Sequence, residues 1–312
     1  MRLIAAFLRL IRWPNLFFII LTQCLFYFCV FTPMLKFPLP SSFDILFWLL
    51  VMASVCIAAA GYIINDYFDF HIDAINKPKK VVIDKVIKRR WAIIWHWFLS
   101  GLGILLTAYV SYKTRKLHIL FTNTACVILL WFYSTTFKKK ILWGNIIISL
   151  LTAWVILVIY FFVGTGIGKW QSPDLALDVK RLYKFAILYA GFAFLLSVVR
   201  EAVKDLEDMD GDLKYGCRTM PIVWGVPAAK VYTAIWLVVC IGVLTAIMIY
   251  TGLSGWWGAA LYIAIAVVTP LFMILVALGK ASVPGAYHKI STMLKLVMLA
   301  GILSMLFFLI LK

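Results

Sequence analysis

The feature that most constrains this fold is a series of apolar runs, each long enough to cross a lipid bilayer. A helix that crosses the hydrocarbon core needs about 20 apolar residues. The runs cover residues 14–33, 43–64, 92–112, 117–136, 141–163, 182–203, 229–250, 256–278 and 290–311. Hydrophobic residues make up 64% of the 312 residues and charged residues 14%, which excludes a soluble globular domain. We expect an all-α polytopic membrane protein with nine transmembrane helices around a central cavity.

The basic residues lie mostly in the short segments between these runs, and their distribution predicts the orientation. With the N-terminus in the cytoplasm, about 21 Lys and Arg residues face inward and about nine face outward. Cytoplasmic loops of membrane proteins carry such an excess. The same pattern accounts for the net charge of +17 without nucleic acid as a partner. We expect a multi-pass protein among membrane lipids (in the cytoplasmic membrane of a prokaryote), whose first run is a span and not a cleavable signal.

Nine of the 13 acidic residues gather in two stretches, each directly after an apolar run and on the predicted cytoplasmic side. The members of the first stretch are Asp66, Asp69 and Asp73. The members of the second are Glu201, Asp205, Glu207, Asp208, Asp210 and Asp212. The first three stand at i, i+3 and i+7, and Asp205, Asp208 and Asp212 repeat that spacing, which puts each set on one stripe of a helix.

Carboxylates crowded at a membrane edge repel one another, so a cation is expected between them. Oxygen-only ligands favour a hard cation, Mg²⁺ or Ca²⁺, and Mg²⁺ commonly joins one or two carboxylates to phosphate oxygens. The pattern therefore predicts two carboxylate sets that bind a phosphorylated substrate through Mg²⁺. The alternative, two solvated acidic loops with helix caps, leaves the matching spacing and the shared membrane side unexplained.

Four segments resemble the UbiA superfamily of intramembrane prenyltransferases, which also has nine spans. They are Asn65-Asp66-x-x-Asp69-x-x-x-Asp73 (first signature), Lys204 to Asp212 (second signature), Tyr133-Ser134-x-x-x-Lys138 with Gly144-Asn145, and Arg12-x-x-Asn15. The likeness covers nearly the whole chain. It implies transfer of a prenyl group from a prenyl diphosphate to a lipid or small aromatic acceptor, with Mg²⁺ as cofactor and the active site facing the cytoplasm.

The resemblance also implies roles for individual residues. The implied catalytic residues are Asp66, Asp69, Asp73, Asp205, Asp208 and Asp212. The implied metal ligands are Asn65, Asp66, Asp69, Glu201, Asp205 and Asp208. The implied substrate-binding residues are Arg12, Asn15, Tyr133, Lys138, Asn145 and Lys204. Lys138 has an alternative role as a membrane-orienting charge, and Gln23, inside the first run, is expected to hydrogen-bond another helix.

One segment departs from the family pattern. Many members continue the first signature with Asn-Arg-Pro-x-Arg-Pro, whereas this chain has Asn76-Lys77-Pro78-Lys79-Lys80. Lys can attract phosphate as a point charge but cannot form the bidentate fork of Arg. A direct role for Lys79 and Lys80 in binding phosphate is therefore not implied.

The domain organisation follows from the positions of the acidic stretches. We expect one prenyltransferase domain over residues 1–312. An acidic stretch follows the second helix of helices 1–4 and the second helix of helices 5–8, which suggests an internal repeat with helix 9 added. The chain carries no signal for an oligomeric state.

The acceptor is the least constrained element of the function. The run from Arg200 to Asp212 looks most like the branch that makes digeranylgeranylglyceryl phosphate. Its donor is geranylgeranyl diphosphate and its acceptor is (S)-3-O-geranylgeranylglyceryl phosphate. Aromatic-acceptor branches (quinone, 4-hydroxybenzoate, haem or chlorophyll) share the Asp motifs and remain an alternative.

Two other classes of membrane protein also place acidic residues at cation sites. A cation-coupled transporter would hold its ion near the midplane, whereas these carboxylates lie at one membrane edge. A CDP-alcohol phosphotransferase would need an Asp-x-x-Asp-Gly-x-x-Ala-Arg run, and here Phe70 follows Asp69.

Overall fold

The computed structural model describes residues 2–34, 41–76, 82–167 and 173–310, and almost all of them are helical. Among these residues no strand occurs, and one isolated bridge joins Ile83 and Ile87. Nine helical segments in the described part are long and apolar enough to cross a membrane: Trp13–Met34, Phe43–Phe68, Arg89–Thr114, Leu117–Thr135, Trp143–Gly164, Lys180–Glu207, Val226–Leu253, Trp257–Lys280 and Pro284–Leu309. The predicted all-α fold with nine spans is confirmed. Lys79 and Lys80 lie outside the described residues.

The chain divides into two compact units. The first unit covers residues 1–138 and 154–187. It contains α1 (Arg2–Leu10), α2 (Trp13–Leu25), the π-helix η1 (Phe26–Phe31), the 3₁₀-helix η2 (Thr32–Met34), α3 (Ser41–Phe68), α4 (Phe70–Asn76), α5 (Arg89–Thr114) and α6 (Leu117–Thr135). It also holds the later part of α7 (Trp143–Ile167) and the first part of α8 (Pro173–Glu207).

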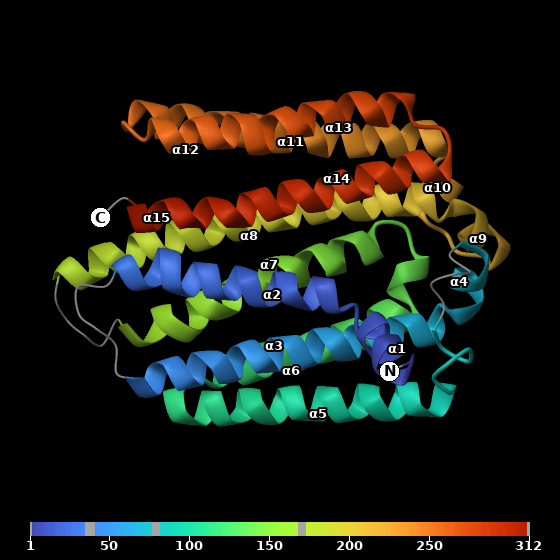
Figure 1. The fold of residues 1–312 in the computed structure, drawn as a ribbon, viewed down its shortest axis with the longest axis horizontal. Helices are drawn as coiled ribbons and strands as arrows, with labels where there is room; N and C mark the ends of the chain where they lie inside the picture. Colours follow the sequence, from blue (N-terminus) through green and yellow to red (C-terminus); the bar gives the residue numbers. More distant parts are fainter. Residues whose placement is uncertain (1, 35–40, 77–81, 168–172, 311–312) are drawn as a thin grey trace. The chain divides into compact units, whose positions relative to one another are not determined.

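Helices α3 and α5 lie side by side in the first unit (Figure 1). Their close approach depends on Gly103 of α5, where an added Cβ would lie 2.7 Å from the Ile57 side chain and 3.2 Å from the Ala53 carbonyl oxygen. Gln23 of α2 donates hydrogen bonds to Ser54 Oγ at 3.0 Å and to the Val155 carbonyl oxygen at 3.1 Å. The interhelical role predicted for Gln23 is confirmed.

The boundary between α1 and α2 is a left-handed residue. Arg12 has φ 52° and ψ 53°, which breaks the helix, and Pro14 in the first turn of α2 starts the next one. A non-glycine residue pays a conformational cost in this region. The break lies at the membrane side that the charge pattern predicts to be cytoplasmic. Asp66, Asp69 and Asp73, the first acidic motif, lie on the same side.

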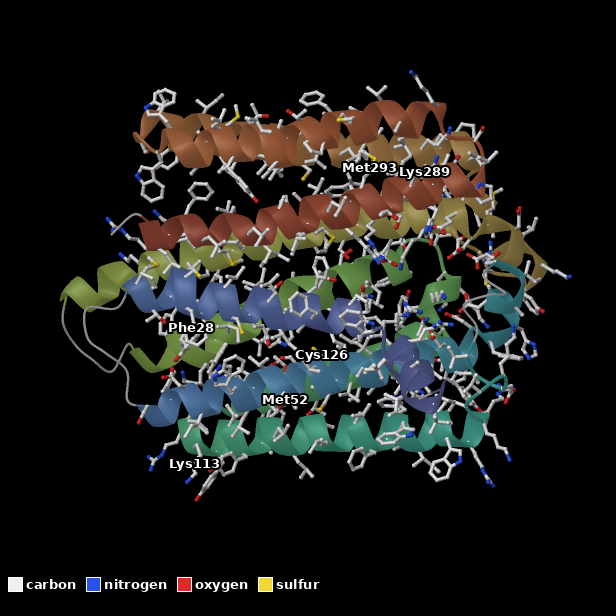
Figure 2. All side chains as sticks on the ribbon, viewed as in Figure 1. Phe28, Met52, Lys113, Cys126, Lys289 and Met293 are labelled. Carbon is white, nitrogen blue, oxygen red and sulfur yellow. The ribbon has the colours of Figure 1, made fainter. Side chains whose placement is uncertain are left out.

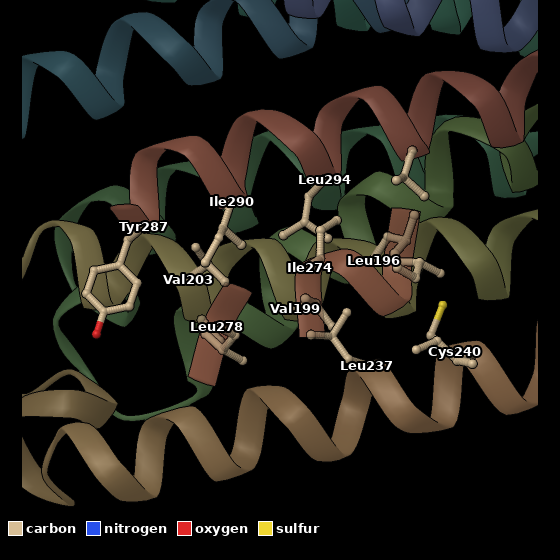
Figure 3. Close-up of a cluster of buried hydrophobic side chains, with 14 of the residues drawn as sticks. Leu196, Val199, Val203, Leu237, Cys240, Ile274, Leu278, Tyr287, Ile290 and Leu294 are labelled. Atoms are coloured by element: carbon tan, nitrogen blue, oxygen red, sulfur yellow. The ribbon is translucent and has the colours of Figure 1, made fainter. Parts of the chain in front are cut away.

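The second unit covers residues 139–153 and 188–312. Its elements after α8 are α9 (Met209–Lys214), α10 (Met220–Val223), α11 (Val226–Leu253), α12 (Trp257–Tyr262), the π-helix η4 (Ile263–Val268), α13 (Thr269–Lys280), α14 (Pro284–Leu303), the 3₁₀-helix η5 (Ser304–Leu306) and α15 (Phe307–Ile310). Figure 3 shows its core, in which Val203 of α8, Leu237 of α11, Leu278 of α13 and Leu294 of α14 interdigitate. All four side chains are at most 1% exposed.

The outer faces of the helices are apolar, and charges gather at helix ends. Phe28 and Met52, labelled in Figure 2, are exposed although they lie within spans, as lipid-facing side chains are. Lys113 lies in the last turn of α5, where its ammonium is 5.7 Å from the centre of the Tyr109 ring. The chain is an integral multi-pass membrane protein.

Candidate active site

The first acidic motif lies where α3 passes into α4. The helix is interrupted at Asp69, yet backbone hydrogen bonds continue through the break. The Asp69 N–H donates to the Asn65 carbonyl at 2.9 Å, and the Asp73 N–H donates to the Asp69 carbonyl at 2.8 Å. These helical bonds keep the predicted spacing of the three carboxylates close to that of one continuous helix.

Two cations from distant parts of the sequence pair with this motif. An Arg12 Nη donates to Asp66 Oδ1 at 2.5 Å, and Lys138 Nζ donates to Asp69 Oδ2. The Asp69 side chain is only 3% exposed, so its charge is mostly withdrawn from water. A buried carboxylate is stable when paired with such a cation, and breaking the pair leaves an uncompensated charge.

The pKa values of both cations report the same arrangement. Burial is the largest effect and lowers the pKa of Arg12, but Asp66, Tyr62 and Asp73 together outweigh it, so the net shift is upward. Burial is likewise the largest effect and lowers the pKa of Lys138, but Asp69, Tyr133 and Asp73 together reverse it and raise the pKa well above the usual value. Asp73 adds its charge in both cases. Both cations therefore stay protonated beside the motif.

One buried polar atom of the motif fits a metal ligand. Asn65 is 8% exposed, and its Oδ1 has no hydrogen-bond partner among the described residues. Leaving such an oxygen buried is costly unless a ligand satisfies it. An amide oxygen and the Asp66 and Asp69 carboxylates of the same motif are oxygen donors of the kind that Mg²⁺ prefers. The residues present thus fit the expected cation.

The second acidic motif repeats the construction where α8 passes into α9. The helix is interrupted at Asp208, whose N–H donates to the Lys204 carbonyl at 2.8 Å. The Asp212 N–H donates to the Asp208 carbonyl at 3.1 Å. Asp208 therefore occupies the position in its motif that Asp69 occupies in the first.

The partners of the second motif come from the same unit. Asn145, at the start of α7 and 6% exposed, donates from Nδ2 to Asp205 Oδ2 at 3.0 Å. The Arg218 N–H donates to the Lys139 carbonyl at 2.9 Å, which joins the segment before α7 to the loop after α9. These two bonds hold the beginning of α7 against the motif.

A family model described as the UbiA prenyltransferase family matches residues 25–286. The chain belongs to this family. This UbiA family member is therefore an enzyme of the prenyltransferase class, which decides against the transporter as an alternative. Its relatives include the digeranylgeranylglyceryl phosphate synthase of Methanothermobacter thermautotrophicus, 31% identical over 67% of each chain. The synthase of the same name from Methanosphaera stadtmanae is 27% identical over 82% of this chain and 86% of its own.

Solved structures show the same fold at low sequence identity. One, from work on digeranylgeranylglyceryl phosphate synthase in membranes, has a TM-score of 0.60 at 23% identity and covers 98% of this chain and 99% of its own. A UbiA homologue from Archaeoglobus fulgidus, bound to DMAPP and Mg²⁺, has a TM-score of 0.57 at 17% identity and covers 96% of this UbiA family member and 98% of its own chain. These likenesses support the nine-span helical architecture.

The structure places the other predicted site residues as follows. Glu201 Oε1 accepts from Arg200 Nη1 at 2.9 Å and lies 3.2 Å from Lys204 Nζ, so Lys204 is beside the second motif as expected. Tyr133 lies close enough to Lys138 to contribute to the raised pKa of that ammonium. The Asn15 N–H donates to the Arg12 carbonyl at 2.8 Å. Asn15 therefore lies in the first turn of α2, next to the α1–α2 boundary.

Three neighbours of the motifs of this UbiA family member were not predicted from the sequence. Arg200 binds Glu201, Arg89 lies 4.8 Å from the centre of the Tyr67 ring, and His288 Nδ1 is 2.8 Å from Glu207 Oε1. The adjacency of Arg200 and Glu201 was a signal for the first. No spacing rule could have found the other two, because they join segments far apart in the sequence.

Proposed function

We propose that this enzyme transfers a geranylgeranyl group from geranylgeranyl diphosphate to the free hydroxyl of (S)-3-O-geranylgeranylglyceryl phosphate within the membrane, in a Mg²⁺-dependent reaction. The observation that carries the proposal is the duplicated motif: two helix breaks, at Asp69 and Asp208, each flanked by carboxylates at the same spacing. The names of the relatives and the diphosphate-bound family structure support the donor class and the metal.

The reaction breaks the bond between the allylic carbon C1 and its diphosphate oxygen, and diphosphate leaves with the electron pair. The acceptor oxygen forms the new ether bond to C1, and its proton is released to solvent or to the departing diphosphate. The barrier lies in the charge that gathers on the leaving group. Groups that are stronger partners of the transition state than of the substrate accelerate the step.

The carboxylates and amide oxygens would hold the cation, and the basic residues would hold phosphate. The proposed metal ligands are Asn65, Asp66, Asp69, Glu201, Asp205 and Asp208. When bound, Mg²⁺ supplies positive charge to the leaving diphosphate. Arg12 and Lys138 contact Asp66 and Asp69, which puts a guanidinium and an ammonium within reach of any phosphate bound there. We propose that Asp73 and Asp212 do not contact the metal directly and instead bind its water molecules or a neighbouring lysine.

The catalytic side is proposed to face the cytoplasm. Both motifs follow spans whose flanking segments belong to the basic side of the charge distribution, which is the cytoplasmic side in the usual pattern. The apolar tails of donor and acceptor would then enter from the bilayer. Each buried methylene contributes about 0.8 kcal/mol to such binding.

The test is a transfer assay with purified full-length chain, labelled geranylgeranyl diphosphate and Mg²⁺. The acceptors are (S)-3-O-geranylgeranylglyceryl phosphate, 4-hydroxybenzoate and a quinone precursor, and the competing donors are geranyl and farnesyl diphosphate. We expect transfer to the lipid hydroxyl and preference for the longest donor. Transfer to an aromatic acceptor alone would replace the acceptor in the proposal and leave the prenyltransferase class intact.

A further inference from the structure

We propose that Arg12 and Lys138 make the binding of metal and of diphosphate mutually dependent, so that neither binds tightly to the first motif without the other. This inference rests on the proposed function and adds to it a coupling between the two ligands. The residues concerned all lie in the first unit. The argument needs only their contacts and charges.

The first step is occupancy. Without a ligand, one oxygen of Asp66 is bound by the Arg12 guanidinium at 2.5 Å and one oxygen of Asp69 is bound by the Lys138 ammonium. The Asp69 carboxylate is almost fully buried, so water cannot replace a lost partner there. A metal ion that binds these carboxylates must therefore share them with the cations or displace them.

The second step is charge. The Arg12–Asp66 pair and the Lys138–Asp69 pair are each neutral, and Asp73 brings one negative charge toward both cations. A divalent ion alone adds two positive charges next to a guanidinium and an ammonium. A diphosphate alone adds several negative charges next to three carboxylates. A divalent ion alone, although attracted by the net negative charge, must take the carboxylates from the two cations and leaves them unpaired beside two added positive charges, and a diphosphate alone is repelled by the carboxylates.

The third step is the exchange that removes both penalties. When metal and diphosphate arrive together, the carboxylate oxygens can turn to the metal and the two cations can turn to phosphate oxygens. Charge-assisted hydrogen bonds lost on one side are then formed on the other. The orphaned Asn65 Oδ1 also gains a partner in this state. Such coupling is reciprocal, because each ligand must raise the affinity of the other by the same factor.

The binding experiment separates metal from diphosphate. Radiolabelled Mn²⁺, which shares the oxygen-ligand preference of Mg²⁺, is dialysed against detergent-solubilised full-length chain with no diphosphate present. In a second arm, labelled inorganic pyrophosphate is dialysed with and without Mg²⁺. Wild type is expected to bind Mn²⁺ alone weakly and pyrophosphate only with Mg²⁺.

The decisive variant is Lys138→Met, which keeps the length of the side chain and removes its charge. We expect Mn²⁺ alone to bind about tenfold more tightly and pyrophosphate with Mg²⁺ to bind about tenfold more weakly. Lys139→Met is the matched control: it removes the same charge from the adjacent residue, whose side chain is exposed. It should move both affinities by less than about twofold.

Opposite shifts in the two affinities identify the exchange, because a variant that only damages the fold would weaken both. Mn²⁺ binding that is unchanged or weaker in Lys138→Met would overturn the inference. So would tight Mn²⁺ binding to the wild-type protein without diphosphate that is lost in Asp69→Asn, because that binding would belong to the first motif. Failure of the proposed function is recognised separately, by a wild-type protein that binds both ligands cooperatively and transfers no prenyl group.

Discussion

The two acidic motifs have the same backbone geometry but differ in the side chains that contact their carboxylates. At Asp69 and at Asp208 the helix is interrupted in the same way, with the same pattern of backbone hydrogen bonds before and after the break. The first motif meets full charges directly, since Arg12 and Lys138 contact its carboxylates. In the second, a neutral amide, Asn145, binds Asp205, and the cations Arg200 and Lys204 pair with Glu201.

This difference indicates that the two motifs have different roles although their local backbone structure is the same. Cations beside a carboxylate can transfer to phosphate, whereas a neutral amide can only orient the carboxylate that it binds. We therefore expect the first motif to control diphosphate binding and the second to control the geometry of metal binding. The following four predictions test that contrast, beginning with the largest effect.

Replacing the aspartate at either helix break should abolish catalysis, because Asp69 and Asp208 occupy equivalent positions and both are proposed to bind the metal. Asp69→Asn and Asp208→Asn should each lower kcat/KM for the prenyl diphosphate by at least about a thousandfold. Steady-state transfer with labelled donor measures this, and circular dichroism checks that the helices are retained. A loss of less than tenfold at one position would show that only the other motif is catalytic.

Removing a lysine should raise KM for the diphosphate more at the first motif than at the second. Lys138→Met should raise KM for the diphosphate about tenfold, since its ammonium is a direct candidate partner of phosphate. Lys204→Met removes a cation that lies 3.2 Å from Glu201, and it should raise KM by only about twofold. Equal effects in the same transfer assay would remove the proposed difference between the motifs.

Changing the amide at Asn145 should disturb metal use more than diphosphate use. Asn145→Asp puts a second carboxylate against Asp205, and we expect about a hundredfold loss of kcat with a raised Mg²⁺ requirement. Asn145→Leu removes the hydrogen bond without adding charge and should cost about tenfold. The Mg²⁺ dependence of the rate measures both variants. If the leucine variant is the worse of the two, packing rather than charge decides the role of Asn145.

The smallest expected effect concerns a lysine outside both motifs, whose pKa is shifted in the opposite direction to that of Lys138. Lys116, between α5 and α6, is 7% exposed and donates to the Phe162 carbonyl, and burial lowers its pKa to about 8. The folded state then binds fewer protons than the unfolded state between about pH 8 and the ordinary lysine pKa of 10.5. The folded protein should gain stability as pH rises through that window.

Thermal unfolding of wild type and Lys116→Met from pH 7 to 10 measures this contribution. The wild-type Tm should rise by about 2 °C relative to the variant across the window, because only wild type loses the buried charge. For Lys138 the sign is opposite: its raised pKa keeps its stabilising contribution through this range. A parallel pH profile for wild type and Lys116→Met would show that Lys116 is neutralised in some other way.

The sequence predicted the spans well because bilayer thickness leaves few choices. Nine apolar runs predicted the nine spanning helices that the described residues contain. The differences lie at the helix ends, such as α8, which already starts at Pro173 instead of residue 182. The two π-helices were not predicted, since the insertion of one residue hardly changes a uniformly apolar pattern. The orientation in the membrane and the internal repeat stay predictions.

The candidate site was partly predictable from the spacing of the carboxylates. The i, i+3, i+7 pattern located Asp66, Asp69 and Asp73 on one helical stripe, and the backbone bonds preserve it. The partners were beyond such reasoning, since Arg12 is 54 residues from Asp66 and Lys138 is 69 residues from Asp69. Lys138, which could equally have been a membrane-orienting charge, proves to contact the motif.

The left-handed backbone of Arg12 carries a consequence for how this position can evolve. An arginine in that conformation costs about 1–2 kcal/mol that a glycine would not. Selection for stability alone would favour glycine at the turn, while selection for a guanidinium beside Asp66 favours arginine. Arg12→Gly would then relax the turn and lose the charge together. The residue therefore marks a point where stability and activity are in conflict.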